Sequence, residues 1–388
     1  MLRDLAYELA PDKRRALILI LVAILISGVM VGLTIPLISL MLDARGLSPA
    51  VIGLNTAMLG IAALVALPLL PGLVARFSMR HILITSIMGA IGCFIAYVVV
   101  DSVWGWFVIR FIHGLVHTAL FALAEFWINH ILHDKIRGRV LGLYSALFAG
   151  GLMIGPLILL ITGTDRPAPF LTGAALMALA AVPFITARIQ MPRFENEAGT
   201  GGTMAFLWAA PTIMLTAMIF GLVETGLFQL MPIYALRAGN ETQMIAWMMT
   251  TIGAGNMAFQ LPIGWMLDRF DRRAVLVACT LAGVGGGASL PFLIAQPYLL
   301  YPSLFIWAGL LFGLYTIGLS MVGDRYQGAE LLRANAAYVL LYSLGTLVGP
   351  ILLGVAMDIW DPQGFPAAII AVCLGFTLLI LSRSAQKP

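Results

Sequence analysis

The chain has 388 residues, of which 61% are apolar and only 10% are charged. An ordinary globular domain is roughly 45–50% apolar and about 25% charged, and a soluble core cannot bury so large an apolar excess. This composition excludes an aqueous enzyme, a nucleic-acid-binding protein and a secreted disulfide scaffold. A membrane-crossing helix needs about 20 apolar residues, so the length allows about a dozen crossings joined by short loops.

The cysteines and the first apolar run do not indicate other chemistry. Cys93, Cys279 and Cys373 each lie in an apolar stretch without a second Cys or His at ligand spacing, a pattern that indicates neither a metal site nor a disulfide. We therefore expect no metal and no cofactor. The run from Ala16 to Leu42 is too long for the core of a signal peptide and lacks a cleavage pattern, so we expect it to remain as a helix.

Apolar runs bounded by charges or by Gly and Pro clusters predict twelve membrane-spanning helices in chain order. They are Ala16 to Leu42, Val51 to Val74, Ile82 to Val100, Trp104 to Leu132, Val140 to Thr162, Ala168 to Ala187, Met204 to Leu236, Met244 to Leu267, Ala274 to Ala295, Leu299 to Val322, Ala334 to Met357 and Phe365 to Leu381.

The basic residues predict the orientation of these spans, because Lys and Arg are retained on the cytoplasmic side. With the N-terminus inside, 18 of the 22 basic residues lie in inner segments, and the outer loops carry only Arg45, Arg166 and Arg237. Arg110 is the one basic residue within a span. The net charge of +4 then reflects topology, with no nucleic acid required. We predict a multi-pass inner (plasma) membrane protein with both termini in the cytoplasm.

The chain repeats itself at an offset close to half its length. Gly151 to Pro156 in the fifth span recurs as Gly345 to Pro350 in the eleventh, 194 residues later, and Arg76 recurs as Arg269. Because an even number of crossings separates the copies, the two halves have the same orientation. We predict an all-α integral membrane fold with 12 transmembrane helices in two pseudo-symmetric six-helix bundles. Parallel halves around a midplane cavity are a standard arrangement for alternating access.

The repeat and the charges also predict the domain organisation. A cytoplasmic N-terminal segment covers 1–15, the N-terminal six-helix bundle 16–187, a polar cytoplasmic linker 188–203, the C-terminal six-helix bundle 204–382 and a cytoplasmic tail 383–388.

Three motifs give the chain a resemblance to the major facilitator superfamily. The segment GWMLDRFDRR at 264–273 is similar to the loop signature of that family, with Asp271 in place of its second glycine. The first copy, PGLVARFSMR at 71–80, has Ala75 where the acid belongs. RFIHG at 110–114 matches a second family motif. The resemblance covers essentially the whole chain and implies the twelve-helix fold, a transport function and a monomer.

A third motif, in the fifth span, resembles one associated with proton-driven exporters. Gly142 is followed after eight residues by Gly151 and then by Gly155–Pro156, while Leu159–Leu160 replaces the usual closing glycines. In the family, this Gly-Pro kink is linked to gating and export. Taken mechanically, the glycines predict tight packing between the two halves. A finer resemblance, through Arg110-Phe and EFWIN at 125–129, is to the poorly characterised YcaD-like branch.

The loop acid Asp268 is predicted to close an inner gate. An acid beside the N-terminus of a helix is stabilised by unpaired amide N–H groups and the helix dipole. We expect Asp268, with its neighbour Arg269, to latch onto the start of the fifth helix near Arg137 and Arg139. The alternative is that these charges only fix the topology.

The fourth span carries four ionisable residues on one helical stripe. Arg110, His113, His117 and Glu125 fall within an arc of roughly 120°. Each would cost about 2.5–3.5 kcal/mol in contact with lipid at the bilayer centre, so we expect them to line the cavity. Arg110 and the two histidines are candidate substrate-binding residues, and Glu125 is a candidate proton site. The alternative is that Arg110 and His117 make hydrogen bonds within helix packing.

The seventh span has one acid, Glu224, with no basic residue within a turn of it. Removal from water favours the protonated form of a carboxylic acid, so Glu224 is the leading candidate for proton coupling. The alternative is a neutral glutamic acid hydrogen-bonded in the packing. Gln229 on the same span is a candidate for substrate binding, as are Asn256 and Gln260, which lie four residues apart on one face of the eighth span.

These features predict a secondary active transporter and not an enzyme. The main hypothesis is proton-coupled efflux of a small organic molecule, amphipathic or anionic. Its partners are then that small molecule, protons and the lipid bilayer. Two alternatives stay open: a symporter or uniporter that imports a small solute, and a transporter-like sensor or membrane assembly factor without flux.

Overall fold

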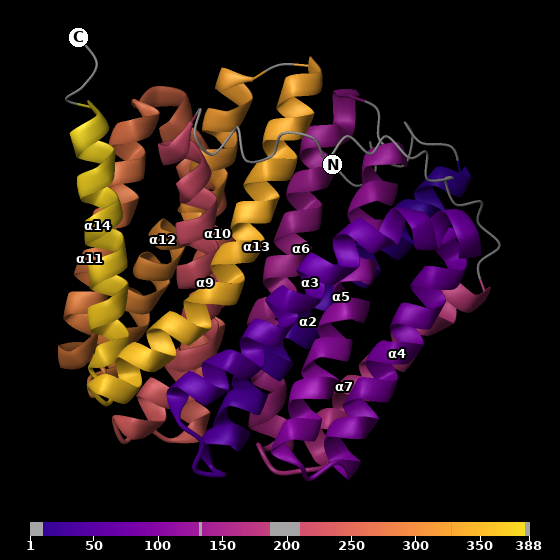
Figure 1. Ribbon diagram of the computed structural model, residues 1–388, viewed down its shortest axis with the longest axis horizontal. Helices are drawn as coiled ribbons and strands as arrows, with labels where there is room; N and C mark the ends of the chain where they lie inside the picture. The colour runs from indigo at the N-terminus through magenta and orange to yellow at the C-terminus, as the bar shows by residue number, and fades with distance from the viewer. Residues whose placement is uncertain (1–10, 132–133, 187–209, 327, 385–388) are drawn as a thin grey trace. The chain divides into compact units, whose positions relative to one another are not determined.

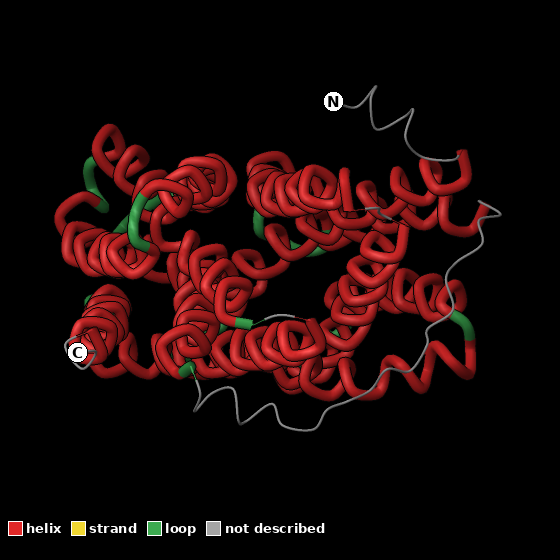
Figure 2. Tube along the Cα trace, turned by 90° about the horizontal axis from the view of Figure 1, so that it is seen from above, coloured by secondary structure: helices red, strands yellow, loops and turns green. Residues whose placement is uncertain are grey.

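The computed structural model describes residues 11–131, 134–186, 210–326 and 328–384, and these form helices joined by short loops (Figures 1 and 2). The helices in chain order are α2 (Pro11–Asp43), α3 (Pro49–Phe77), α4 (Met79–Val99), α5 (Val103–Ile131), α6 (Asp134–Thr162), α7 (Ala168–Thr186), α9 (Pro211–Arg237), α10 (Thr242–Arg269), α11 (Arg272–Leu293), α12 (Pro297–Arg325), α13 (Gly328–Ile359) and α14 (Gly364–Ser384).

Each predicted span corresponds to one of these helices, and the predicted fold class is confirmed. Within the described residues, eleven of these helices are long and apolar enough to cross a membrane, and α10 falls short of that threshold. Residues such as Gln243, Asn256 and Gln260 lower its hydropathy. Because α10 lies between two spanning helices, we assign it as a spanning helix as well, which brings the number of crossings to twelve. A helix that lines a polar site is the one expected to fall below an apolarity threshold.

Contacts divide the chain into two compact units whose boundaries differ from those of the sequence repeat. One unit contains Met1–Thr34 and Ile61–Glu197, and the other contains Ile35–Gly60 and Ala198–Pro388. The end of α2 and the start of α3 therefore pack with the C-terminal helices, although the repeat assigns them to the N-terminal bundle. The predicted linker, 188–203, lies outside the described residues.

The repeated glycines hold the first and fifth helices of each half together. A Cβ atom on Gly151 or Gly155 would collide with the backbone of α2, where Gly28 and Gly32 supply the facing surface. Gly345 and Gly349 meet the backbone of α9 in the same way. The expectation that these glycines pack the two halves against each other was wrong. The α2–α6 contact lies within one unit, and the α9–α13 contact lies within the other. A run of small residues predicts a close approach but not the partner.

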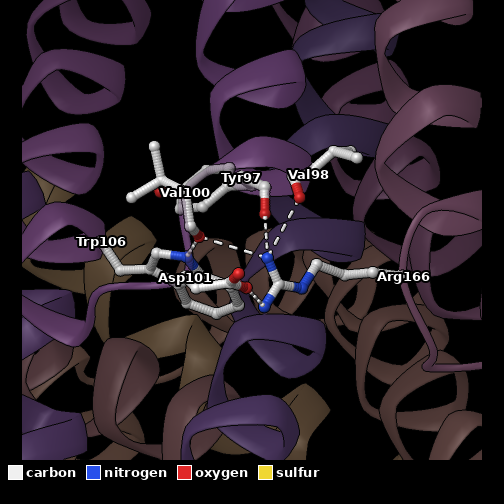
Figure 3. Close-up of polar contacts among 6 residues, drawn as sticks. All are labelled: Tyr97, Val98, Val100, Asp101, Trp106 and Arg166. Atoms are coloured by element: carbon white, nitrogen blue, oxygen red, sulfur yellow. Dashed lines mark hydrogen bonds and ion pairs between the residues drawn. The ribbon is translucent and has the colours of Figure 1, made fainter.

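Arg166, one of the three basic residues in the predicted outer loops, closes one end of the N-terminal unit (Figure 3). Its Nη1 atom donates to the carbonyl oxygens of Tyr97, Val98 and Val100 at distances of 3.1–3.2 Å, which satisfies the end of α4. Its Nη2 atom lies 2.6 Å from the Asp101 carboxylate. The guanidinium also lies over the Trp106 ring, 5.3 Å from its centroid. The α4 carbonyls and an acid thus share one cation.

Substitution of Arg166 by Ala is expected to destabilise the N-terminal unit by about 1–3 kcal/mol, because the last carbonyl groups of α4 lose their donor. Arg166→Lys should recover only part of this loss, since an ammonium lacks the planar fork. The measurement is the thermal unfolding midpoint in detergent, with Arg76→Ala, at the exposed end of α3, as the control. An equal midpoint for Arg166→Ala and the control would contradict this role.

Candidate functional site

Glu224 of α9 is hydrogen-bonded to a tyrosine of α13. The Tyr342 hydroxyl donates to Glu224 Oε2 at 2.9 Å, and both side chains are half-buried. Glu224 forms no ion pair with a described residue. The sequence required a partner from another helix or a proton, and Tyr342 is that partner. A tyrosine hydroxyl can both donate and accept, so it can serve the charged and the neutral forms of the acid.

Aromatic rings surround this pair. Phe220, one turn before Glu224, stacks on Tyr342 with ring centroids 5.6 Å apart. The ring centroid of Tyr315 of α12 lies 5.2 Å from that of Phe220 and 5.7 Å from that of Tyr342. The Tyr338 hydroxyl donates to the Tyr315 carbonyl at 3.0 Å. The acid is therefore held among rings from three helices. No sequence motif marked Tyr315 or Tyr342, because only the fold brings α12 and α13 to α9.

Asn256 and Gln260 face one another along α10 as predicted. Gln260 Nε2 donates to Asn256 Oδ1 at 2.9 Å, and Thr316 of α12 donates to Gln260 Oε1 at 2.8 Å. Asn256 is buried and Gln260 is half-buried. Among the described residues these amides bond to each other and to α12, while Glu224 receives its hydrogen bond from Tyr342. Thr316 is a further polar residue that the sequence did not single out.

Gln229 does not line an accessible surface. It is fully buried, at 0% exposure, and its Oε1 atom accepts a hydrogen bond from Thr56 of α3. Gln229 is thus enclosed in this structure, and its contact with substrate stays a prediction. Its side chain faces α3.

Arg110 of α5 is buried within the N-terminal unit among aromatic side chains. It is 0% exposed, and none of its three guanidinium nitrogens forms a hydrogen bond with a described residue. Tyr97 of α4 lies beside it and stacks on Phe170 of α7 with centroids 5.2 Å apart. The hydroxyl of Tyr97 also lacks a hydrogen bond among the described residues. A buried charge without hydrogen bonds is costly, and the Tyr97 hydroxyl is the polar group beside this guanidinium.

The two histidines and Glu125 follow Arg110 along α5 in increasingly open surroundings. His113 is 4% exposed and packs against the Phe94 ring of α4, with centroids 5.5 Å apart. His117 is half-buried over Phe121. Glu125 is exposed, near Tyr144 of α6.

In this structure Arg110 and His113 turn toward α4 and do not share an open face with His117 and Glu125, and the role of all four in binding or proton transfer stays a prediction. The helical arc was correct, but an ionisable face can avoid lipid by packing inside a bundle as well as by lining water. The sequence pattern does not distinguish these two surroundings.

The residues of the predicted inner gate are only partly described. Asp268 and Arg269 are exposed at the end of α10, and Arg269 lies over the Trp265 ring, 4.4 Å from its centroid. The side chains of Arg137 and Arg139, and so the latch itself, fall outside the described residues. Pro156 lies within α6 beside the α2–α6 contact of Gly155.

The acid that replaces the second motif glycine has a local role of its own. Asp271 caps α11 by accepting a hydrogen bond from the Ala274 amide at 3.0 Å, which satisfies one free donor at the start of a helix. Its neighbour Arg272 pairs with Asp324 at the end of α12. The loop is therefore built around helix capping and an ion pair.

The comparisons with known proteins follow the fold and the motifs. The family model described as "Major Facilitator Superfamily" matches residues 20–245 and 213–388, which together span nearly the whole chain. The chain belongs to the major facilitator superfamily. This membership makes it a multi-pass membrane transporter, with a small molecule as its cargo, and not an enzyme.

Two distant relatives within the superfamily carry the description of uncharacterized transporters. The chain is 27% identical to the uncharacterized MFS-type transporter YfkF of Bacillus subtilis, over 91% of this chain and 90% of the relative. It is 26% identical to the uncharacterized MFS-type transporter YcaD of Escherichia coli, over 74% of each. The predicted resemblance to YcaD is thereby confirmed as a distant homology.

Solved structures confirm the fold. A mutant of the nucleoside transporter NupG superposes with a TM-score of 0.80 at 16% identity, covering 95% of this chain and 99% of that one. The human organic anion transporter MFSD10 gives a TM-score of 0.67 at 14% identity, covering 96% and 100%. At these identities the likeness concerns the arrangement of helices alone.

Proposed function

We propose that the protein is a proton-coupled secondary transporter that exports a small organic molecule by alternating access. The observation that carries this proposal is Glu224, an acid within a membrane-spanning helix that bonds to Tyr342 and forms no ion pair with a described residue. A carboxylate without a cation in low-dielectric surroundings favours its neutral form. Glu224 is thus suited to hold a proton in one state of the cycle and release it in another.

Exchange follows if substrate and proton compete for the same site. Binding of a substrate beside Glu224 would stabilise the carboxylate and displace the proton, and Tyr342 would keep its hydrogen bond in both states by reversing its donor role. The rings of Phe220 and Tyr315 supply an apolar surface for the rest of the molecule. Export as the direction rests on the Gly155–Pro156 motif of the fifth span, and the assignment of the cytoplasmic side rests on the basic residues.

A second candidate function, uptake of an anionic solute, is favoured by one observation. Arg110 is completely buried, and its guanidinium forms no hydrogen bond with a described residue. An anion that reached it would supply the missing charge, with the Tyr97 hydroxyl as a further donor. His113 and His117 lie along the same helix and each retains one unbonded ring nitrogen among the described residues.

The export hypothesis is tested by a ligand screen on the purified protein at two pH values. A small molecule that competes with a proton should raise the unfolding midpoint more at the higher pH, because fewer molecules then hold the proton. Saturation at a hundred times the dissociation constant corresponds to about 2.7 kcal/mol of stabilisation. A ligand whose shift is independent of pH would argue for a uniporter. A folded protein that binds ligand without any flux in liposomes would support the sensor alternative.

The anion candidate makes a separate prediction. If Arg110 binds an anionic solute, thermal stabilisation by organic carboxylates should be lost in Arg110→Gln and reduced at least tenfold in apparent affinity in Arg110→Lys, because the ammonium cannot make a two-pronged contact. Neutral and cationic compounds should stabilise the wild type and Arg110→Gln equally. Carboxylate stabilisation that survives in Arg110→Gln would exclude this role.

A further inference from the structure

Arg237, at the last turn of α9, bridges two acids from different parts of the chain. Its Nη2 atom lies 2.8 Å from Asp43 Oδ1 at the end of α2, and its Nη1 atom lies 2.8 Å from Asp361 Oδ2 in the α13–α14 loop. The side chains of Arg237 and Asp43 are only 25% and 13% exposed. Partial burial and two-sided pairing distinguish this bridge from a solvated surface ion pair.

Arg237 and one of its two partners, Asp43, occupy equivalent positions in the sequence repeat. Asp43 and Arg237 are 194 residues apart, which is the offset that separates the repeated glycine motifs. Each therefore ends the first helix of its half. Identical charges at symmetry-related sites would repel each other, whereas an acid in one half and a base in the other attract. The repeat thus carries opposite charges at a pair of equivalent sites where the ends of its first helices meet.

A second polar contact lies beside the bridge. The Ala50 amide, in the first turn of α3, donates to Asp358 Oδ2 near the end of α13 at 3.0 Å. An acid at a helix N-terminus satisfies a free donor and interacts favourably with the helix dipole. The Asp43–Arg237 ion pair and the Ala50–Asp358 hydrogen bond thus hold the segment between α2 and α3 on the C-terminal helices, while Asp361 pairs with Arg237 from the α13–α14 loop.

Glycines allow α3 to approach α13 closely behind these polar contacts. A Cβ atom on Gly53 would collide with the carbonyl oxygen of Pro350, and one on Gly60 would lie 3.1 Å from Leu347. From the other side, a Cβ on Gly354 would meet the Pro49 carbonyl. The two helices are thus in backbone contact along the first three turns of α3, which is why residues 35–60 fold with the C-terminal unit (Figure 1).

We propose that these contacts are the outer gate of the transporter, shut in this conformation, and that Arg237 is its latch. The distribution of basic residues predicts that this end of the helices lies on the outer side of the membrane. The inference deepens the proposed transport function, since only a protein that alternates needs such a gate. The gate opens when the α2–α3 segment separates from α9 and α13, which breaks the Arg237–Asp43 ion pair.

The closed gate also contains groups that favour opening. Thr56 and Gln229 bond to each other at 0% exposure, but Gln229 Nε2 and both amide atoms of Asn55 are buried without a hydrogen bond among the described residues. Buried polar atoms without partners are costly, and water admitted by opening would satisfy them. The Arg237–Asp43 ion pair therefore stabilises the closed gate against this cost. Loss of the pair should shift the equilibrium measurably toward the open gate.

Spin-label distances across the gate test the proposal. Labels on Ser48→Cys and Glu241→Cys, both exposed outer positions, are placed in a background with the three buried cysteines replaced by Ala. In liposomes we expect one dominant short distance for the otherwise unchanged protein. Arg237→Ala should increase a longer-distance population at least fivefold. Gly53→Leu should do the same by wedging α3 away from α13.

Matched variants define the outcomes. Gly375→Leu, at a glycine with no atom within 4 Å of its Cβ position, should leave the distances unchanged. Unaltered distances in both Arg237→Ala and Gly53→Leu, with the monomer peak retained in gel filtration, would overturn the gate. A response to Gly53→Leu alone would overturn Arg237 as the latch. The distance measurement requires neither substrate nor a proton gradient. It therefore tests the gate independently of whether Glu224 couples transport to protons.

Discussion

Glu224→Gln is expected to abolish proton movement coupled to transport while leaving the protein folded. The amide preserves the size of the side chain and its hydrogen bond with Tyr342, but it cannot exchange a proton. In liposomes that contain a pH-sensitive dye, addition of a ligand found in the thermal screen should collapse an imposed pH gradient for the wild type. The variant should show a rate indistinguishable from that of empty liposomes, a loss of at least a hundredfold.

Two variants show whether the effect belongs to this acid. Tyr342→Phe removes the hydroxyl that supports Glu224 and should slow coupled flux by about tenfold, in line with the loss of one hydrogen bond to a charged group. Glu241→Gln, at an exposed position between α9 and α10, should have no effect. Full coupling in Glu224→Gln would exclude Glu224 as the proton site and leave Glu125, on α5, as the candidate to test next.

Gly151→Ala is expected to destabilise the protein although it adds only one methyl group. Its new methyl group would collide with the carbonyl oxygen of Leu25 and lie 2.7 Å from the Val29 amide nitrogen, both of which belong to the α2 backbone. Backbone cannot move aside as a side chain can, so overpacking should cost about 1–3 kcal/mol. Unfolding midpoints in detergent measure this loss.

The adjacent residue provides the control. Gly150, on the same helix, has no atom within 4 Å of its Cβ position, so Gly150→Ala should be neutral or stabilising by up to about 1 kcal/mol through helix propensity. The repeat predicts the same loss in the other half for Gly345→Ala, whose methyl group would collide with the Met218 carbonyl oxygen, and Gly375→Ala on α14, with no atom within 4 Å of its Cβ position, is the control there. Equal midpoints for Gly150→Ala and Gly151→Ala would contradict the α2–α6 contact.

The sequence predicted the features that depend on local pattern. Apolar runs located each of the twelve helices in the described parts of the chain, because the bilayer sets a minimum length that no soluble helix needs. Glu224 stood out because an acid in such a run is rare and expensive. Asn256 and Gln260 were correctly placed on one face, because that inference needs only the helical period.

Features that depend on which helices meet were not predictable in the same way. The period placed Arg110 and His113 on one stripe, but their burial against Phe94 and Tyr97 depends on the neighbouring α4. The repeated glycines indicated a close contact without its partner. Arg237 entered the sequence argument only as one of three outer basic residues, although its distance of 194 residues from Asp43 was a signal that could have been read.

The remaining central claim is that substrate and proton exclude one another at Glu224. The most direct measurement is the number of protons released when a screened ligand is added to purified protein in weakly buffered detergent solution. The account predicts close to one proton per bound ligand for the wild type and none for Glu224→Gln. Ligand binding by the wild type without proton release, or equal release by Glu224→Gln, would contradict it.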